Sequence, residues 1–345
     1  TGGGNFGGMS NVIVDSDAFG RAQATLTLGL IVGYNNATVE ISGISGTVTL
    51  LFTSDAVATL PDRIIIISGQ SQTGVVGQPL MLPFVVEVQD VFGNPLPDVN
   101  VRFIIDLGGG YLSTTNPVRT NVLGQAQTIL TLGTLTGWNN VTAEITATGI
   151  SSVIFSAWGG PDAPAQVIQI SGDGQTAVVG AALPLPMTVL VTDAYGNPVE
   201  GAQVNVSIPG GDARGTVVGD PAPITNATGH AHAYILLGNV SGPLSVVFDG
   251  PNGTSVTFTA TALAGPPHTV SVVSGDGQTA VVGTVLPLPM TVLVTDAYGN
   301  PASGATVWFN VTAGDASVTG SNPATYSRVM APIRELFAQV PEARV

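Results

Sequence analysis

An internal repeat constrains the fold of this chain more than any other feature of its sequence. Residues 171–180 recur unchanged as residues 274–283, and a looser copy runs over residues 68–77, so each copy begins 103 residues after the one before. A second marker, Asp-x-x-Gly-Asn-Pro, starts at residues 90, 193 and 296 and has the same spacing. A period of this length predicts successive copies of one domain rather than a single large fold.

The repeat divides the chain into units, which are called here the first, second, third and last unit. Matching segments in the later half of a unit begin at Gly20, Gly124 and Gly229, and Pro- and Gly-rich stretches mark the joints. Short Pro-rich linkers predict that neighbouring units are semi-rigid in relation to each other. The predicted ranges are 1–63 (the second half of a domain), 64–165, 166–268, 269–323 (the first half of a domain), and an irregular or helical tail over 324–345.

Within a unit, the residue pattern is that of β-strands. Met187, Val189 and Val191 alternate with more polar neighbours, and Val292 and Val294 repeat the pattern one period later. Such a period of two places alternate side chains in a core. About seven short strands in roughly 100 residues, bounded by turn residues, are typical of an immunoglobulin-like sandwich. The sequence therefore predicts an all-β rod of tandem immunoglobulin-like β-sandwiches, with partial domains at both ends.

The turn and its flanking strands also carry a family resemblance. The run Asp193-Ala194-Tyr195-Gly196-Asn197-Pro198, followed by a strand from Gly201 and by Thr228-Gly229-His230-Ala231, resembles bacterial immunoglobulin-like domains of the invasin and intimin type. In that family such domains form rods or stalks that hold something away from a cell surface. The resemblance implies an extracellular structural or adhesive element whose partners are copies of itself and a host or neighbouring-cell surface.

Charge and composition exclude several other classes of protein. The net charge is −14 with eight basic residues, so nucleic acids and anionic membrane surfaces are poor partners. Cysteine is absent, which excludes disulfides and thiol chemistry. The longest run without polar side chains, residues 177–187, is too short to span a bilayer. The first residues lack the pattern of a signal peptide, so we expect any targeting segment to be removed or to lie outside this sequence.

The candidate sites are mostly structural, and no catalytic constellation or cofactor site is evident, so no enzyme is predicted. The three turn motifs are expected to be capped by their aspartates, with calcium binding as the alternative. His230 and His232 lie two apart on a predicted strand and could ligate a metal, but their counterparts Gln125 and Gln127 indicate a solvent-facing pair. The turn residues are Asp90, Gly93, Asn94, Pro95, Asp193, Gly196, Asn197, Pro198, Asp296, Gly299, Asn300 and Pro301.

Carbohydrate enters the predictions in two ways. Sequons of the form Asn-x-Ser/Thr are consistent with a secreted glycoprotein, although duplication and chance also produce them. A glycan-binding or accessory module of a larger secreted protein is the alternative function. It requires exposed aromatics on one face, but Trp138, Trp158 and Trp308 do not align across the repeat, and only Trp138 has an aromatic counterpart, Tyr34. The sequon asparagines are Asn36, Asn140, Asn205, Asn226, Asn239, Asn252 and Asn310.

The two end units each match only half of the repeat, which leaves two interpretations open. In the first, the chain is part of a longer array that supplies the missing halves. In the second, the first unit of one subunit completes the last unit of the next by strand exchange, which gives a head-to-tail filament.

Overall fold

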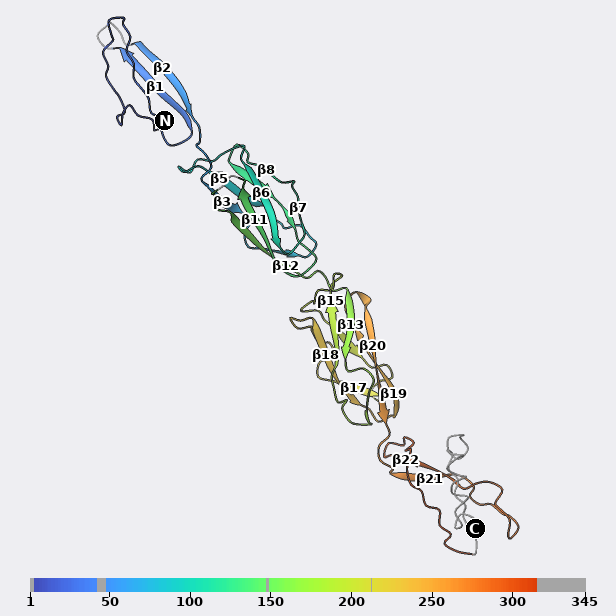
Figure 1. The fold of residues 1–345 in the computed structure, drawn as a ribbon. Helices are drawn as coiled ribbons and strands as arrows, with labels where there is room; N and C mark the ends of the chain where they lie inside the picture. Colours follow the sequence, from blue (N-terminus) through green and yellow to red (C-terminus); the bar gives the residue numbers. More distant parts are fainter. Residues whose placement is uncertain (1–2, 42–47, 147–148, 212, 315–345) are drawn as a thin grey trace.

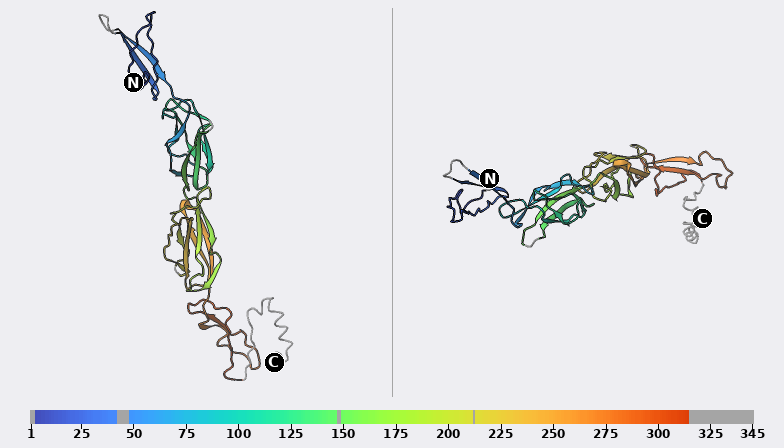
Figure 2. Two further views of the ribbon diagram at one scale, coloured as in Figure 1. Left: turned by 60° about the vertical axis from the view of Figure 1, so that its left-hand side comes forward. Right: turned by 90° about the horizontal axis from the view of Figure 1, so that it is seen from above.

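The computed structural model describes residues 3–41, 48–146, 149–211 and 213–314, and almost all of its regular structure is β-strand. One short 3-10 turn, η1 (Pro251–Gly253), interrupts the strands. Figures 1 and 2 show the units following one another end to end, joined by short linkers. The predicted tail over 324–345 lies outside the described residues. In the described part, no helix has the length and apolar character needed to cross a membrane.

The second unit is a sandwich of two sheets. One sheet has the order β3-β5-β9 and the other the order β4-β12-β11-β6-β8, while β7 and β10 form a separate short pair. All neighbours are antiparallel except β4 and β12, which are parallel. The strand bounds are β3 (Arg63–Ser68), β4 (Gln72–Val75), β5 (Phe84–Gln89), β6 (Asn100–Leu107), β7 (Tyr111–Leu112), β8 (Val118–Arg119), β9 (Gln125–Thr128), β10 (Leu130–Thr131), β11 (Gly137–Ile145) and β12 (Val153–Gly160).

The third unit has the same architecture. Its sheets have the orders β13-β15-β18-β17 and β14-β20-β19-β16, and β14 is parallel to β20 as β4 is to β12. The predicted all-β, immunoglobulin-like fold is therefore confirmed. The strand bounds are β13 (Gln166–Ser171), β14 (Gln175–Val178), β15 (Met187–Thr192), β16 (Asn205–Ser207), β17 (Gly215–Val218), β18 (His230–Leu237), β19 (Gly242–Asp249) and β20 (Ser255–Leu263).

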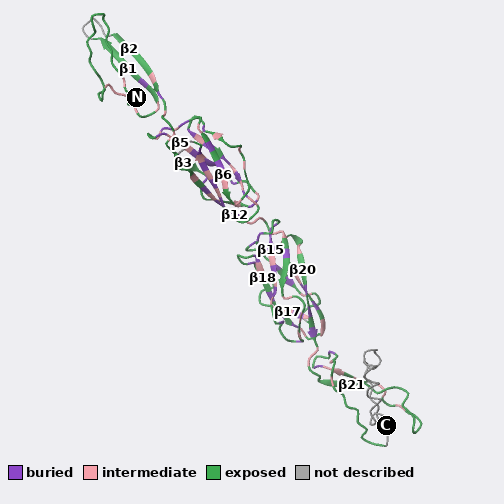
Figure 3. Cartoon of the chain, viewed as in Figure 1, coloured by how far each residue is buried: buried purple, intermediate pink, exposed green. Residues whose placement is uncertain are grey.

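Alternating side chains from both sheets form one core in each complete unit. In β15, Met187, Val189 and Val191 are fully buried, as the period of two predicts. In the second unit, the rings of Phe84 and Phe155 stack across the core with centroids 4.5 Å apart. Figure 3 shows this buried interior in both central units. Burial of such aromatic and branched side chains supplies most of the free energy that stabilises a sandwich.

The repeated segment over residues 171–180 is the place where the chain crosses from one sheet to the other. β13 pairs with β15 in one sheet, β14 pairs with β20 in the other, and Gly172 lies between them with φ +94°. A methyl group on Gly172 would overlap the carbonyl oxygen of Pro186, and the same holds for Gly69 and Gly275 at Pro83 and Pro289. Only glycine fits such a position.

A glutamine side chain holds this crossing in place. The Gln175 amide donates to the carbonyl oxygens of Gly172 (2.8 Å) and Leu185 (2.9 Å), and it accepts from the N–H of Leu185 (2.8 Å). Gln72 and Gln278 make the same three bonds in the second and last units. The glutamine of the repeated Ser-Gly-x-x-Gln sequence thus stabilises the crossing between the sheets, and we assign no ligand to it.

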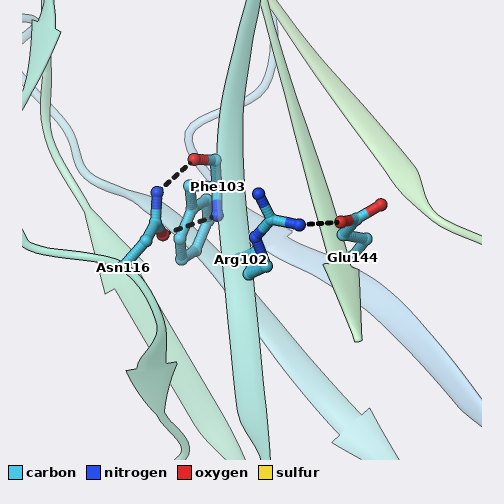
Figure 4. Close-up of polar contacts among 4 residues, drawn as sticks. All are labelled: Arg102, Phe103, Asn116 and Glu144. Atoms are coloured by element: carbon cyan, nitrogen blue, oxygen red, sulfur yellow. Dashed lines mark hydrogen bonds and ion pairs between the residues drawn. The ribbon is translucent and has the colours of Figure 1, made fainter. Parts of the chain in front are cut away.

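In the second unit, the side chain of Asn116 forms hydrogen bonds with the backbone of β6, as a neighbouring strand would (Figure 4). Asn116 accepts from the N–H of Phe103 (2.9 Å) and donates to its carbonyl oxygen (2.6 Å). On the other side of β6, Arg102 pairs with Glu144 of β11 at 3.3 Å. Because both ionic groups are well exposed, this pair contributes little stability. The Asn116 bonds matter more, because they satisfy backbone groups that would otherwise form an open edge.

In the first unit and in the last unit, the described residues form one two-stranded sheet each. The first unit contains the hairpin of β1 (Gly33–Ile41) and β2 (Val48–Ala56), and the last unit contains β21 (Thr269–Ser274) paired with β22 (Thr291–Thr295). Strand register places Phe52 where Phe155 and Phe258 are fully buried in the complete units, yet Phe52 is 61% exposed. Figure 3 shows the resulting contrast between exposed ends and buried centre.

Candidate functional site at the joints between units

The Asp-x-x-Gly-Asn-Pro motif forms a tight turn at the end of a core strand. In the third unit, the Asp193 Oδ1 atom accepts from the N–H of Tyr195 (2.9 Å) and of Asn197 (2.8 Å). Gly196 has φ +87°, a conformation that favours glycine. Asp90 and Asp296 cap their turns in the same way. These contacts are those of a self-contained turn.

The second carboxylate oxygen of each aspartate holds the linker that enters the unit. Asp193 Oδ2 accepts from the N–H of Asp162, 31 residues earlier, at 3.0 Å. Asp90 and Asp296 accept from the N–H of Thr59 (3.0 Å) and of Gly265 (2.9 Å). Each aspartate is fully buried or nearly so. The linker is therefore fastened to the unit that follows it.

The asparagine of the motif reaches back to the preceding unit. The Asn197 side chain donates to the carbonyl oxygen of Thr134 (2.8 Å) and accepts from the N–H of Thr136 (3.1 Å). Its amide nitrogen also donates to Asp193 Oδ2 at 2.8 Å, so one buried amide ties together the turn and the neighbouring unit. Asn94 binds Leu30 and Val32, and Asn300 binds Asn239 and Ser241, through the same backbone atoms.

An aromatic side chain completes the second joint. Tyr195 lies against Gly77 of the preceding unit, so closely that a methyl group on Gly77 would stand 2.7 Å from the tyrosine hydroxyl oxygen. At the third joint Tyr298 faces Gly180, with a corresponding separation of 3.7 Å. At each joint, therefore, an aspartate carboxylate binds the linker and an asparagine amide binds the preceding unit. At two of the joints a tyrosine also packs against a glycine of the preceding unit.

The buried carboxylates are held in their ionised form. Burial alone would raise the pKa of Asp90, but hydrogen bonds from the Asn94 amide and from the N–H groups of Thr59, Asn94 and Phe92 outweigh it and lower the pKa to about 2. The same balance, with Asn300 as the amide donor, lowers the pKa of Asp296 to about 2, and the pKa of Asp193 is lowered as well. The joints thus depend on charged acceptors that water does not reach.

This balance predicts that the fold weakens in acid. Because the folded-state pKa lies below the ordinary 3.8, the ionised Asp90 stabilises the protein above about pH 4, and that contribution is lost as the pH falls through about 2. Carboxyl ¹³C NMR shifts measured from pH 6 to about pH 1.5 should show the two carboxyls of Asp90 and Asp296 titrating last. Asp90→Asn should lose less stability over this range. An Asp90 midpoint near 3.8 would contradict the prediction.

The other predicted site residues do not come together as a metal centre. His230 is half-buried and His232 is exposed; the Nδ1 atom of His230 lies 3.0 Å from the Thr228 hydroxyl, and the His232 ring packs edge-on against Tyr234. In residues 3–314, apart from the gaps given above, no three His, Asp or Glu side chains are grouped closely enough to hold a metal ion. Both oxygens of each turn aspartate are already bonded to the chain, which leaves the calcium alternative without support.

Known proteins similar to this chain were found by sequence and by structure. No family model matches the chain. A curated relative, the inverse autotransporter adhesin YeeJ of Escherichia coli (strain K12), is 26% identical over 242 residues, and the match covers 69% of this chain. This relative is a bacterial adhesin, the class of protein that the resemblance of the turn motif led us to expect. The matched part is 10% of the length of the adhesin, so this chain corresponds to a small part of that relative.

Two solved bacterial structures are also similar to this chain. The E. coli adhesin FdeC is similar with a TM-score of 0.47 and 22% identity, over 72% of this chain and 79% of that one. InvD of Yersinia pseudotuberculosis is similar with a TM-score of 0.44 and 16% identity, over 69% of this chain and 71% of that one.

The sequence predicted the Asp-x-x-Gly-Asn-Pro turn but not its hydrogen bonds to the preceding unit. Asp193 and Gly196 are sufficient for a local turn, so the recurrent asparagine needed another reason. The signal was present in the chain itself, since all three copies of the motif keep Asn94, Asn197 and Asn300 while the residue before the glycine changes between Phe and Tyr. A buried amide must find partners, and these partners lie 61 to 64 residues earlier.

Proposed function

We propose that this chain is a structural, adhesive segment of an extracellular stalk on a cell surface, with no enzymatic role. The observation that carries the proposal is the joint, because three successive joints are each fastened by a buried aspartate and a buried asparagine of the same motif. The similarity to an inverse autotransporter adhesin supports a surface location and an adhesive context. A stalk must transmit position over a distance, and a chain of sandwiches does so only if its joints resist bending.

The joint chemistry favours stiffness for a physical reason. The Asn197 amide makes two hydrogen bonds to the preceding unit, to Thr134 and Thr136, and a paired donor and acceptor fix orientation as well as distance. Its burial withholds water, the usual competitor for such bonds. The Asp162 N–H bond anchors the linker at a second point, so bending would break contacts on both sides.

Asn197→Ala tests this function directly. The variant should keep the third unit folded but widen the distribution of angles between the second and third units. Because the chain has no cysteine, spin labels can be attached at introduced cysteines, Val122→Cys in the second unit and Ser255→Cys in the third, both at exposed positions. Pulsed electron paramagnetic resonance should show one narrow distance peak in the parent and a peak at least about twice as broad in the variant.

A matched control separates the joint from local turn chemistry. Asn226 also caps a turn in the third unit, accepting from the N–H groups of Thr228 and His230, but it bonds only within its unit. Asn226→Ala should leave the distance peak narrow. A parent peak already as broad as that of Asn197→Ala would show that the units are loosely connected, and the proposal of a stiff stalk would fail.

A finer form of this function rests on the two end units. We propose that the first unit of one copy is completed by the last unit of another, which produces a head-to-tail fibre. Phe52 occupies the place of Phe155, and Met290 occupies the place of Phe84, which stacks on Phe155 in the second unit. Phe52 is 61% exposed and Met290 49%, so each end presents the surface that the other end would cover.

Sedimentation of the chain over a range of concentrations tests this assembly. The parent should form species larger than the 34.7 kDa of one chain as concentration rises. Phe52→Asp should abolish the growth, whereas Tyr111→Asp, at an exposed aromatic of the second unit, should leave it intact. A parent that stays at a single subunit mass would exclude the head-to-tail fibre and leave the stalk proposal standing.

Glycosylation remains a prediction. Six sequon asparagines are exposed and Asn140 is half-buried, although Asn252 already donates its amide to the Pro164 carbonyl oxygen at 2.7 Å. The mass of the chain from its native source would decide between glycans and chance sequons.

A further inference from the structure

Two tryptophans that do not align across the repeat meet on one sheet face of the second unit. Trp138 of β11 and Trp158 of β12 are direct register partners, and their ring centroids lie 5.3 Å apart at 80°. Trp138 is 55% exposed and Trp158 is 42% exposed. Trp138 and Trp158 lie 20 residues apart on two different strands, so aligning the units with each other does not reveal that the two side chains meet.

The fold does not require this pair. The equivalent partners are Pro243 and Thr261 in the third unit, which has the same sheet and a complete core without them. In the first unit they are Tyr34 and Asp55. An aromatic pair with half its surface in water, present in only one of three otherwise matching hairpins, indicates a role in binding rather than in folding.

The surroundings of the pair are polar and uncharged. Alternation along β11 and β12 places Asn140 and Ser156, themselves register partners, on the same outward face in the next row. Thr73 of β4 lies beside Trp158. Among the described residues, no protein group bonds the side-chain amide of Asn140 or the hydroxyl of Ser156. Both are therefore available to a ligand in a chain that carries no glycan on Asn140.

We propose that Trp138, Trp158, Asn140 and Ser156 bind a neutral carbohydrate chain. The negative face of an indole ring attracts the polarised C–H groups on the apolar side of a pyranose ring. The Asn140 amide and the Ser156 hydroxyl supply both donors and acceptors for sugar hydroxyls, as in sites where a few polar groups orient a ligand against aromatic walls.

Charge decides between classes of saccharide. The four proposed binding residues carry no charge, and the Asp106 carboxylate accepts a hydrogen bond from the Thr142 hydroxyl at 2.6 Å. The whole chain has a net charge of −14, which repels sulfated and sialylated glycans. A β-1,4-linked chain of glucose or N-acetylglucosamine, which is neutral and has extended apolar faces, matches the site. The proposal does not depend on the stalk function.

Indole N–H signals in ¹⁵N NMR spectra of the full chain provide the test, because the chain has three tryptophans and one of them is an internal control. Titration with cellohexaose and with chitohexaose should shift the signals of Trp138 and Trp158 with a saturable curve for at least one of the two sugars. The signal of Trp308, which is 81% exposed in the last unit, should not move.

Matched variants assign the signals and guard against misfolding. Trp158→Thr copies the residue that the third unit carries at this place, so it should fold with an unchanged melting temperature and bind about tenfold more weakly. Trp308→Ala should bind as the parent does. Three results would overturn the proposal: no shift with either neutral sugar, an equal shift of all three indoles, or stronger binding to dextran sulfate than to both neutral sugars.

Discussion

Replacing Gly172 by alanine is expected to unfold the third unit. Gly172 has φ +94°, and an added methyl group would overlap the Pro186 carbonyl oxygen and stand 2.7 Å from the Cα atom of Met187. These neighbours are backbone atoms at the start of β15, so they cannot move aside as the tip of a side chain would. The free energy of unfolding of the third unit should fall by about 4 kcal/mol or more, which is exceptional for a single substitution.

The neighbouring Gly174 provides the control. It also has positive φ (+68°), but a methyl group there would meet open space. Gly174→Ala should therefore cost only about 1 to 2 kcal/mol for the left-handed backbone. Hydrogen exchange of peptides from β15 and β18 should show early unfolding in Gly172→Ala only. Equal stability of the two variants would mean that the crossing between sheets adjusts more freely than its contacts indicate.

Asp193→Ala should have the second-largest effect, and it should act on the third unit and its joint together. The substitution removes the acceptor for the N–H groups of Tyr195, Asn197 and Asp162 and for the Asn197 amide. Because this region is buried, some of these donors would be left without partners, at about 1 to 3 kcal/mol each. We expect a loss of at least about 3 kcal/mol in denaturant unfolding, together with a broader distance distribution between the spin labels.

Asp173 is the matched carboxylate for this comparison. Its pKa is also lowered, by hydrogen bonds from the backbone N–H and the hydroxyl of Thr259. It is exposed, however, so water can replace it as an acceptor. Asp173→Ala should therefore lose much less stability and leave the joint unchanged. A loss as large as that of Asp193→Ala would show that burial is not what gives the joint aspartates their importance.

The sequence predicted the sandwich well because strands leave local signals. Met187, Val189 and Val191 are recognisable from their alternation alone, and the turn motif marks the end of their strand. The positions of His230 and His232 away from the core also followed from comparison of the units. These properties depend on neighbours along the chain or on identical places in the repeat.

The joints and the aromatic pair could not be predicted in the same way. The contact between Asn197 and Thr134 crosses 63 residues, and nothing about Thr134 as a residue type marks it as a partner, since only its backbone takes part. The pairing of Trp138 with Trp158 depends on the exact register of two strands. A shift of one residue in that register would have placed one indole in the core.

The joint asparagines bind main-chain atoms of the preceding unit, and this has a consequence for how such a chain can change in length. The residues that supply those atoms are Leu30 and Val32 at the first joint, Thr134 and Thr136 at the second, and Asn239 and Ser241 at the third. Their side chains have nothing in common, yet the bonds are the same. A unit of this kind can therefore be duplicated, deleted or exchanged by recombination without a matching change in its new neighbour, so gene rearrangement alone can set the reach of the protein.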